Sequence, residues 1–480
     1  MMLQREKPVV VWGWTAPGDV VDLSFAGQSR SATADPAGRW EVMLDPLSAS
    51  SEPRRMTISS AKGETRVYDN VLVGDVWILA GQSNMGWPLS KCDGGAEAAR
   101  EADFPWLRVF RQAAIAGASD EPARDVSGGK WSTCQPQNAG DISGVGFFFA
   151  RALHKATNVP VGLVSASMGG TRIQSWIDAE TLRSLPQSAR YFKWEQDARQ
   201  THAEDEAEWK RLVEDLEKQR QEASLRGEPP PAKLSGRLAN GPPLGEKMFR
   251  RHSALFNGKV APIQPFAARG VIWYQGEGNT IEAKAYGPML EALILRWREG
   301  WRAPQLPFLL VQLPRFRVKS DWAGLREAQE TVARKTKGVH LAVTIDTGRE
   351  NDIHPGDKLP VGERLALLAR REILGEDGIA ARAPRAFSAV RNGDSVEVKF
   401  ELDGTTLQKT PDTLAGFAWV NAAGESHPAD AQVTGPDRVR VAAPAEAVGI
   451  TYAFESWPEV SLFDTAGLPA APFRLPIGPP

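Results

Sequence analysis

The hydrophobic and polar positions of the chain change their rhythm along its length. Up to residue 70 they alternate, in segments such as Val9–Trp12, Val20–Phe25 and Trp40–Leu44, and Gly, Pro and Asp residues separate these segments. A period of two between turn residues is typical of antiparallel strands. We therefore expect an N-terminal β-sandwich region over residues 1–70.

From residue 71 short apolar runs alternate with segments expected to be helical. The expected strands are Val76–Ala80, Leu107–Phe110, Val161–Ala166, Gly270–Tyr274, Phe308–Gln312 and Val339–Ile345. The expected helices are approximately Phe147–Lys155, Ala283–Glu299, Ala323–Arg334 and Pro360–Arg371. Buried strands that alternate with helices predict a parallel sheet with helices on both faces. We expect this α/β domain to cover residues 71–383.

Two further segments depart from this alternation. Residues from about 178 to 243 are strongly charged, with apolar residues at helical spacing between Trp209 and Leu216. We expect a helical insertion there, either a lid over the site or a solvated arm. The alternating pattern then returns, for example in Val396–Phe400, and predicts a C-terminal β-region over residues 384–480.

The apolar run Val76–Ala80 ends in the turn sequence Gly81-Gln82-Ser83-Asn84-Met85. A serine at the carboxyl end of a parallel strand lies where open α/β sheets bind ligands, and a nearby base can activate its hydroxyl. The tripeptide carries no meaning by itself, because Gly27-Gln28-Ser29 repeats it in the expected β-sandwich. A serine in such a turn is also a common helix N-cap. Ser83 is therefore a candidate nucleophile that needs a base.

The chain has six histidines that could supply this base. His154 lies in an expected helix, His202 in the charged insertion, His427 in the late β-region and His340 at the start of a strand. His252 has no adjacent carboxylate. These five histidines are therefore less suitable. The sixth, His354, lies in the loop Asp346–Pro355, which leaves the carboxyl end of a strand and contains several acids. An acidic partner fixes the tautomer of a catalytic imidazole. We predict that His354 is the base.

Attack of a serine on a carbonyl also needs hydrogen-bond donors aimed at the developing negative charge. The available donors are the backbone amides of Ser83 and of Gly169 or Gly170, and the side-chain amides of Gln275 or Asn279. Each follows an expected strand, so the parallel order predicts that they meet at one edge of the sheet. Without a catalytic role, Gly169-Gly170 would simply form a turn, and Gln275 and Asn279 would cap a loop with their side-chain amides.

Composition narrows the classes of function. The net charge of −2 gives no electrostatic reason to expect binding to nucleic acid or to an anionic membrane. No apolar run is long enough to span a membrane, and the chain as given begins without a signal peptide. One histidine among carboxylates, without HxH or HExxH, predicts no metal and no other cofactor. Cys92 and Cys134 form no CxxC motif and are either one disulfide or two unrelated thiols.

Around these candidates lie four longer motifs: GDVWILAGQSNM, PVGLVSASMGGTRIQSW, LFNGKVAPIQPFAARGVIWYQGEGN and NDIHPGDKLPVGERLA. Together they resemble the sialate O-acetylesterase family of SGNH-type hydrolases, and the similarity covers nearly the whole chain except the charged insertion. The resemblance implies a three-layer α/β/α, flavodoxin-like catalytic domain with β-sandwich regions at both ends. It implies metal-free removal of O-acetyl groups from acetylated sialic acids or plant-wall glycans such as xylan and xyloglucan. It also implies a periplasmic or secreted location.

Carried over by motif, the resemblance implies that Ser83 is the nucleophile and His354 the base. Many SGNH hydrolases have Asp three residues before the histidine, where this chain has Asn351. The acid is then Asp352, or Asp346 or another residue, or the enzyme works as a Ser-His dyad. The position of the acid stays open at this point.

The resemblance further implies an oxyanion hole formed by Ser83, Gly170 and the block Gln275–Asn279. The residues that follow the motifs closely enough to be substrate contacts are Gln82, Asn84, Trp87, Arg172, Trp176 and Glu277. For Trp87, Arg172 and Trp176 a packing role is the open alternative. Two other functions are weighed against acetylesterase activity. A lipase or aryl esterase is disfavoured because no GxSxG motif is present, and a sugar-binding protein with an inactive site is suggested by the 16 tryptophans. The sequence does not predict the oligomeric state.

Overall fold

The structure is a computed structural model that describes residues 1–113, 120–229, 250–408 and 413–479. The chain divides into two compact units. The first consists of Met1–Gln112, Gly128–Ile173 and Gln264–Pro480, and the second of Ala113–Ser127 and Gln174–Ile263.

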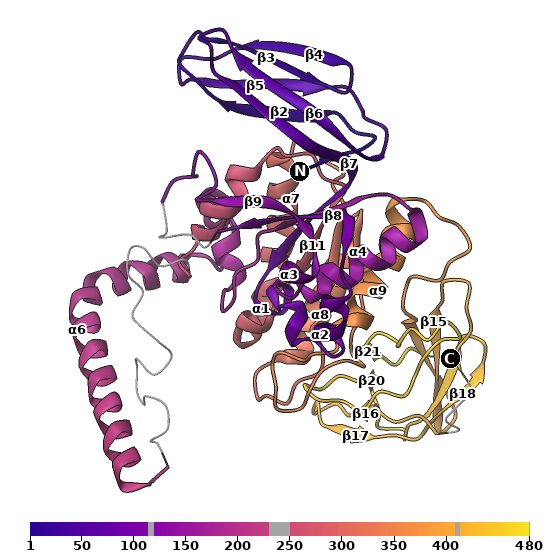
Figure 1. Cartoon of the computed structure of the whole chain (residues 1–480). Helices are drawn as coiled ribbons and strands as arrows, with labels where there is room; N and C mark the ends of the chain where they lie inside the picture. Colours follow the sequence, from indigo (N-terminus) through magenta and orange to yellow (C-terminus); the bar gives the residue numbers. More distant parts are fainter. Residues whose placement is uncertain (114–119, 230–249, 409–412, 480) are drawn as a thin grey trace. The chain divides into compact units, whose positions relative to one another are not determined.

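A mostly parallel sheet forms the centre of the first unit (Figure 1). Its strands are β7 (Thr65–Gly81), β8 (Phe104–Gln112), β9 (Gly129–Cys134), β10 (Val161–Ser165), β11 (Gly270–Tyr274), β12 (Phe308–Val311) and β13 (Val339–Ala342). Their order is β13-β12-β11-β7-β10-β8-β9, and only β9 runs antiparallel to its neighbour. When the outer pair β8 and β9 is left out, the first strand in the chain, β7, lies between the next two, β10 and β11. This is the flavodoxin-like order.

Helices cover both faces of this sheet. The long helices are α4 (Gly144–Thr157), α7 (Ala283–Gly300), α8 (Trp322–Lys335) and α9 (Lys358–Leu368). Trp77 of β7 packs edge-on against Phe149 of α4, and Trp273 of β11 packs edge-on against Trp297 of α7. Trp273 is in register with Ala80, so the two strand tryptophans point to opposite faces. Since α9 packs on α4 and α8 on α7, the prediction of a three-layer α/β/α domain is confirmed.

The chain before the central sheet forms a β-sandwich. One layer is the antiparallel pair β2 (Val9–Trp14) and β5 (Arg39–Leu44), and the other contains β1 (Met2–Gln4), β3 (Val20–Phe25), β4 (Gln28–Thr33), β6 (Ser50–Ser60) and the first half of β7. Alternate residues of both layers, among them Phe25, Trp40 and Met56, share one buried core. The predicted N-terminal β-sandwich is thereby confirmed.

The C-terminal residues form two antiparallel sheets. The first has the order β14 (Arg385–Asn392), β15 (Ser395–Glu401), β19 (Arg438–Ala442) and β18 (Ala431–Gly435). The second has the order β17 (Ser426–Pro428), β16 (Phe417–Val420), β20 (Gly449–Tyr452) and β21 (Phe473–Pro476). Phe400 and Phe473 pack edge-on between the two sheets, with ring centroids 5.9 Å apart. This region is therefore a second β-sandwich.

Strand β7 crosses the first boundary that the sequence predicts. It pairs with β6 through its first half and with β10 and β11 through its second half. The strand thus passes from the N-terminal sandwich into the central sheet without a linker. The division into residues 1–70, 71–383 and 384–480 stays a proposal.

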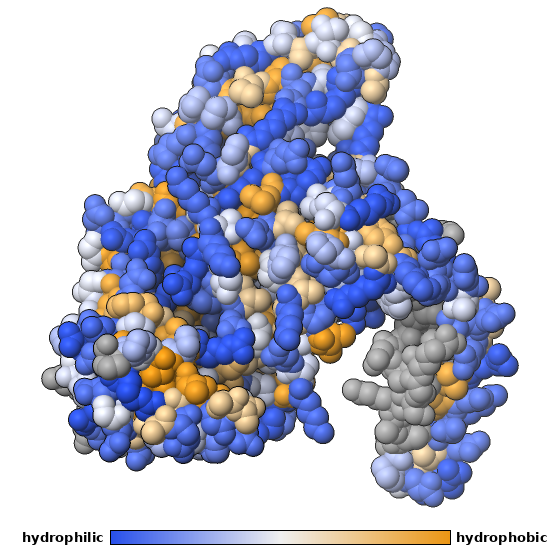
Figure 2. Space-filling view, turned by 180° about the vertical axis from the view of Figure 1, so that it is seen from behind, coloured by the Kyte–Doolittle hydropathy of each residue, from blue (hydrophilic) through white to orange (hydrophobic). Residues whose placement is uncertain are grey.

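The second unit contains most of the charged insertion. Its helices α5 (Ala179–Arg183) and α6 (Ala189–Arg226) lie within the segment predicted to be helical, whose residues 230–243 fall outside the described part. Four of the 38 residues of α6 are buried, and its surface is mostly hydrophilic in Figure 2. No described helix has both the length and the apolar character that crossing a bilayer requires.

The second unit also corrects the sequence argument about His252. That argument found no carboxylate adjacent to this histidine, but Glu195 of α6 contacts its Nδ1. Arg251 donates from Nε to the same carboxylate over 2.7 Å. Burial alone would raise the pKa of Glu195, but hydrogen bonds from His252 and Arg199 lower it to about 2. The carboxylate is supplied by a residue 57 positions earlier, which the local sequence could not show.

Candidate active site

The turn after β7 places Ser83 at the carboxyl edge of the central sheet. Gly81, the last residue of β7, has φ +127°, and a Cβ there would lie 2.1 Å from the carbonyl oxygen of Tyr274 on β11. Only glycine allows this close approach of the two strands. The chain then enters the short helix α1 (Ser83–Gly86), so Ser83 lies at the point between β7 and β11 where a flavodoxin-like sheet binds ligands.

His354 reaches this serine from the loop that follows β13. Its Nε2 lies 2.8 Å from Ser83 Oγ, a hydrogen-bond distance suited to proton transfer. Burial lowers the pKa of His354, and Lys358 and Lys91 lower it further, whereas the charge of Asp352 raises it. A lowered pKa favours the neutral imidazole, which is the form that accepts a proton.

Trp87 lies flat against the His354 ring. The two ring centroids are 4.5 Å apart and the planes differ by 5°, and Trp87 Nε1 donates to the carbonyl of Lys91. The sequence predicted Trp87 only as a substrate contact or a packing residue. Its four-residue spacing from Ser83 puts it beside the site, but no sequence signal shows the stacking, which depends on a loop far along the chain.

No carboxylate is hydrogen-bonded to the His354 ring within the described residues. Asp352 Oδ1 accepts a hydrogen bond from the backbone N–H of His354 over 2.9 Å. Asp346 forms two 2.6 Å hydrogen bonds with the guanidinium of Arg364. Asn351 is exposed. The structure therefore places Asp352 beside His354, in contact with the backbone of that residue.

The Gly169-Gly170 turn after β10 also reaches the serine. A Cβ on Gly169 would lie 3.4 Å from Ser83 Cβ, so this residue packs directly against the nucleophile turn. Gly170, the next residue, is exposed and has φ +69°. The turn after β10 therefore lies beside Ser83, and the role of its backbone amides stays a prediction.

The amide side chains after β11 form hydrogen bonds inside the protein. Gln275 Nε2 donates to Asn279 Oδ1 over 2.9 Å and to Gln82 Oε1 over 3.1 Å. Asn279 Nδ2 donates to Glu282 Oε1 over 3.0 Å. Gln275 and Asn279 are fully buried and Gln82 is 4% exposed. These three residues thus hold the β7 and β11 turns together.

The chain matches, over residues 73–218 and 239–367, the family described as carbohydrate esterase, sialic acid-specific acetylesterase. It belongs to this carbohydrate esterase family. The sialate O-acetylesterase of Mus musculus is 29% identical over 426 residues, which are 80% of this chain and 74% of the relative. The Homo sapiens sialate O-acetylesterase is 26% identical over 421 residues, 80% and 71% of the two chains.

A solved structure extends this similarity to the whole fold. The crystal structure of a carbohydrate acetylesterase from Xanthomonas citri superposes with a TM-score of 0.81 and 33% identity, covering 99% of this chain and 97% of the other. The predicted resemblance to sialate O-acetylesterases is confirmed. The protein is a carbohydrate esterase.

The other predicted substrate contacts of this esterase lie in different surroundings. Asn84 and Glu277 are 1% and 7% exposed and are hydrogen-bonded to each other over 2.6 Å. Arg172 is exposed and its Cγ lies near Gly278. Trp176 is fully buried and belongs to the second unit. Of these four, only Arg172 presents its side chain to solvent.

Lys358 is a residue of the esterase site that the sequence did not indicate. It begins α9, is 1% exposed, and donates from Nζ to Asn84 Oδ1 over 2.7 Å. Its four-residue distance from His354 was the available signal. A lysine in an amphipathic helix is ordinarily on the surface, so its burial could not be expected from the sequence.

The two cysteines of the esterase are buried free thiols. Burial raises the pKa of Cys92 to about 11 and that of Cys134 to about 12. Neither is therefore a thiolate at neutral pH. Within the described ranges, no three His, Cys, Asp or Glu side chains gather in a way that could hold a metal ion.

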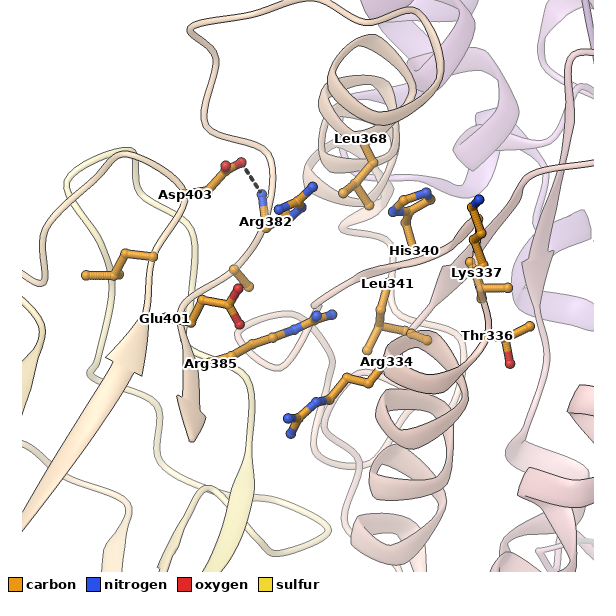
Figure 3. Close-up of a pocket in the computed structure, with 15 residues that line it drawn as sticks. Arg334, Thr336, Lys337, His340, Leu341, Leu368, Arg382, Arg385, Glu401 and Asp403 are labelled. Carbon is orange, nitrogen blue, oxygen red and sulfur yellow. Dashed lines mark hydrogen bonds between the residues drawn. The ribbon is translucent and has the colours of Figure 1, made fainter. Parts of the chain in front are cut away.

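A pocket of about 350 Å³ lies at the other edge of the esterase sheet, where β13 begins (Figure 3). Arg382 in its wall forms hydrogen bonds of 2.6 and 2.9 Å with Glu372, and Arg385 pairs with Glu330 at 3.0 Å. These cations are therefore already neutralised by carboxylates of the chain. Since Ser83 and His354 lie at the carboxyl edge, this pocket is separate from the candidate active site.

Proposed function

We propose that this esterase removes O-acetyl groups from carbohydrates through an acetyl-enzyme on Ser83. The observation that carries the proposal is the 2.8 Å contact between Ser83 Oγ and His354 Nε2 at the carboxyl edge of the sheet. Membership of the carbohydrate esterase family supports the choice of an acetylated sugar as the substrate.

The proposed reaction has two halves. His354 Nε2 takes the hydroxyl proton while Ser83 Oγ attacks the acetyl carbonyl carbon. The tetrahedral intermediate then breaks its bond to the sugar oxygen, which receives the proton from the imidazolium. Water, deprotonated by the same imidazole, attacks the acetyl-enzyme, and acetate leaves as Ser83 regains its proton.

The negative charge of the intermediate needs donors. We propose the backbone amides of Ser83 and Gly170 for this purpose, because the Gly169-Gly170 turn packs against the serine. Gln275 and Asn279 remain candidates. Their amide donors now bond to other side chains, so they would have to exchange a partner to reach the oxyanion.

We propose Asp352 as the acid of the site. Its carboxylate holds the backbone of His354 and its charge raises the pKa of that histidine. It therefore favours the imidazolium that forms during the reaction, without a hydrogen bond to the ring.

Two substrate classes fit this proposal, acetylated sialic acids and plant-wall glycans, and replacing Arg172 distinguishes them. The relatives are named sialate O-acetylesterases, and a sialic acid carries a carboxylate that an exposed guanidinium binds well. If the substrate is an acetylated sialic acid, Arg172→Ala lowers kcat/KM on it and leaves neutral acetylated glycans unaffected. If the substrate is a plant-wall glycan, the variant shows no such difference.

The experiment that tests the function is acetate release from acetylated sialic acid, xylan, xyloglucan and mannan by the wild type and Ser83→Ala. Release from at least one substrate, lost in the variant, supports the proposal. Glycan binding without acetate release would instead identify a binding protein.

The proposal includes a periplasmic or secreted location, which the family resemblance implies. Fractionation of the native host with an antibody to this chain tests it. Detection in the cytoplasmic fraction alone would contradict it.

A further inference from the structure

Asn84 follows Ser83 directly, and its side chain joins two loops and a helix. Its Nδ2 donates to Glu277 Oε1 over 2.6 Å and to the carbonyl of Ile353 over 2.9 Å. Its Oδ1 accepts from Lys358 Nζ over 2.7 Å. An amide group has two N–H donors, and both are used here inside the protein. The side chain is therefore fixed in one orientation by the loop after β11, the loop before His354, and α9.

Glu277 and Lys358 are buried ionisable groups connected through this amide. They are 7% and 1% exposed. Burial raises the pKa of Glu277, although the hydrogen bond from Asn84 opposes this. Burial lowers the pKa of Lys358 to about 8, with Glu277 opposing. Burying two ionisable groups that share no direct hydrogen bond is costly, although Lys358 Nζ also lies 5.3 Å from the centroid of the Tyr274 ring. Stability therefore does not explain the arrangement.

We infer that Asn84, Glu277 and Lys358 form a positioning network that sets the distance between Ser83 Oγ and His354 Nε2. Asn84 is the neighbour of Ser83 in the chain, and Ile353 is the neighbour of His354, so one side-chain amide holds both reacting residues. The inference rests on the proposed function. It gives Asn84 and Glu277 a role other than the substrate contact predicted from the sequence.

The principal test is Lys358→Met, which removes the ammonium but keeps an unbranched apolar side chain. A misplacement of about 1 Å costs up to about 10²-fold in rate. We expect kcat on an aryl acetate to fall about 10- to 100-fold, while KM changes less than about twofold, because Lys358 is buried beneath the site.

The pH profile separates positioning from a general loss of structure. Lys358 lowers the pKa of His354, so its removal raises that pKa and moves the acid limb of kcat/KM to higher pH. The charged groups that face His354 are Asp352, Lys91 and Lys358. The groups that face Lys358 are Glu277, Asp357, Asp352, the Cys92 thiol and the Tyr274 ring of β11. A purely structural role would lower the rate without moving the limb.

Two further variants act as controls. Lys259 is another buried lysine, 2% exposed, in the second unit. Lys259→Met should leave the acid limb and KM unchanged. Asn84→Ala combined with Lys358→Met should lose little more kcat than Asn84→Ala alone, because Lys358 acts through that amide.

The outcomes distinguish this inference from the proposed function. A Lys358→Met enzyme with unchanged kcat and acid limb, alongside an inactive Ser83→Ala, overturns the network and leaves the function intact. An active Ser83→Ala overturns the function itself. Should Lys358→Met not fold, Glu277→Met removes the carboxylate that accepts from the Asn84 amide and keeps an unbranched side chain. We expect it to lower kcat severalfold at constant KM, and an unchanged kcat would again overturn the network.

Discussion

The tripeptide Gly-Gln-Ser occurs twice in the first unit, in two different settings. Gly27-Gln28-Ser29 turns the chain into β4, where Gln28 bonds to the backbone of Asp45 and Ser29 is exposed. Gly81-Gln82-Ser83 joins a parallel strand to a helix, and a histidine from 271 residues later lies against its serine. Among the described histidines none is hydrogen-bonded to Ser29. Under the proposed function, the surroundings and not the tripeptide make Ser83 the reactive serine.

The largest expected effect comes from removing each serine in turn. Ser83→Ala should lower kcat at least about 10³-fold, because losing the nucleophile of a Ser-His pair leaves only binding and oxyanion stabilisation. Ser29→Ala should retain wild-type kcat. Initial rates of acetate release measure both, with thermal melts to show that the variants are folded. Equal losses in the two variants would remove the distinction between the two settings.

The glycines of the two tripeptides, Gly27 and Gly81, also differ in their surroundings. Replacing them by alanine gives the second largest expected effect, which is on stability. Gly27 has φ +78° with nothing within 4 Å of an added Cβ, so Gly27→Ala should cost about 1–2 kcal/mol of backbone strain. Gly81→Ala adds a collision with the carbonyl of Tyr274 and should cost at least about 3 kcal/mol. Thermal midpoints measured side by side check the order. A smaller decrease for Gly81→Ala would show that β7 and β11 separate easily.

Trp87 sharpens the comparison because Ser83, unlike Ser29, contacts a histidine with an aromatic ring stacked on it. An aromatic face stabilises a cation by about 0.5–2 kcal/mol, and the imidazolium is the cation here. Trp87→Leu should lower kcat about tenfold, and Trp87→Phe should lose less because it keeps a ring. Steady-state kinetics on one aryl acetate checks this. A kcat retained in Trp87→Leu with a raised KM would instead make Trp87 a substrate contact.

The smallest expected effect is the change in the pKa of His354 when Asp352 is replaced. Its charge raises the pKa of His354, so Asp352→Asn should lower that pKa and move the acid limb of kcat/KM to lower pH. This is the opposite direction from Lys358→Met. Asp346→Asn is the matched control, since Asp346 pairs with Arg364 and should leave the limb in place. An acid limb that does not move in Asp352→Asn would remove Asp352 from the proposed site.

Local patterns were sufficient to predict much of the fold. Val76–Ala80 and the other apolar runs form buried strands because their residues are continuously apolar. The carboxyl ends of parallel strands lie at one edge of the sheet, so the sequence predicted that Ser83 and the His354 loop lie at the same edge. The antiparallel strand β9 was not predicted. Its sequence, Gly129–Cys134, is polar and half-exposed and pairs only at the outer edge of the sheet.

Contacts between distant side chains could not be predicted in the same way. Three contacts join segments that are far apart in the sequence. They are the stacking of Trp87 on His354, the hydrogen bond of the buried Lys358 to Asn84, and the contact of Glu195 with His252. Each depends on how loops pack after the sheet has formed. A single sequence contains the residues but not these distances.

The most direct test of the account is covalent labelling with a serine-directed fluorophosphonate, followed by mass spectrometry of the peptides. We predict one adduct, on Ser83, that forms at the wild-type rate in Ser29→Ala and is absent from Ser83→Ala. We also predict that His354→Ala slows its formation at least about 10³-fold. An adduct on another residue, or undiminished labelling of Ser83→Ala, would contradict the claim that Ser83 is the activated nucleophile.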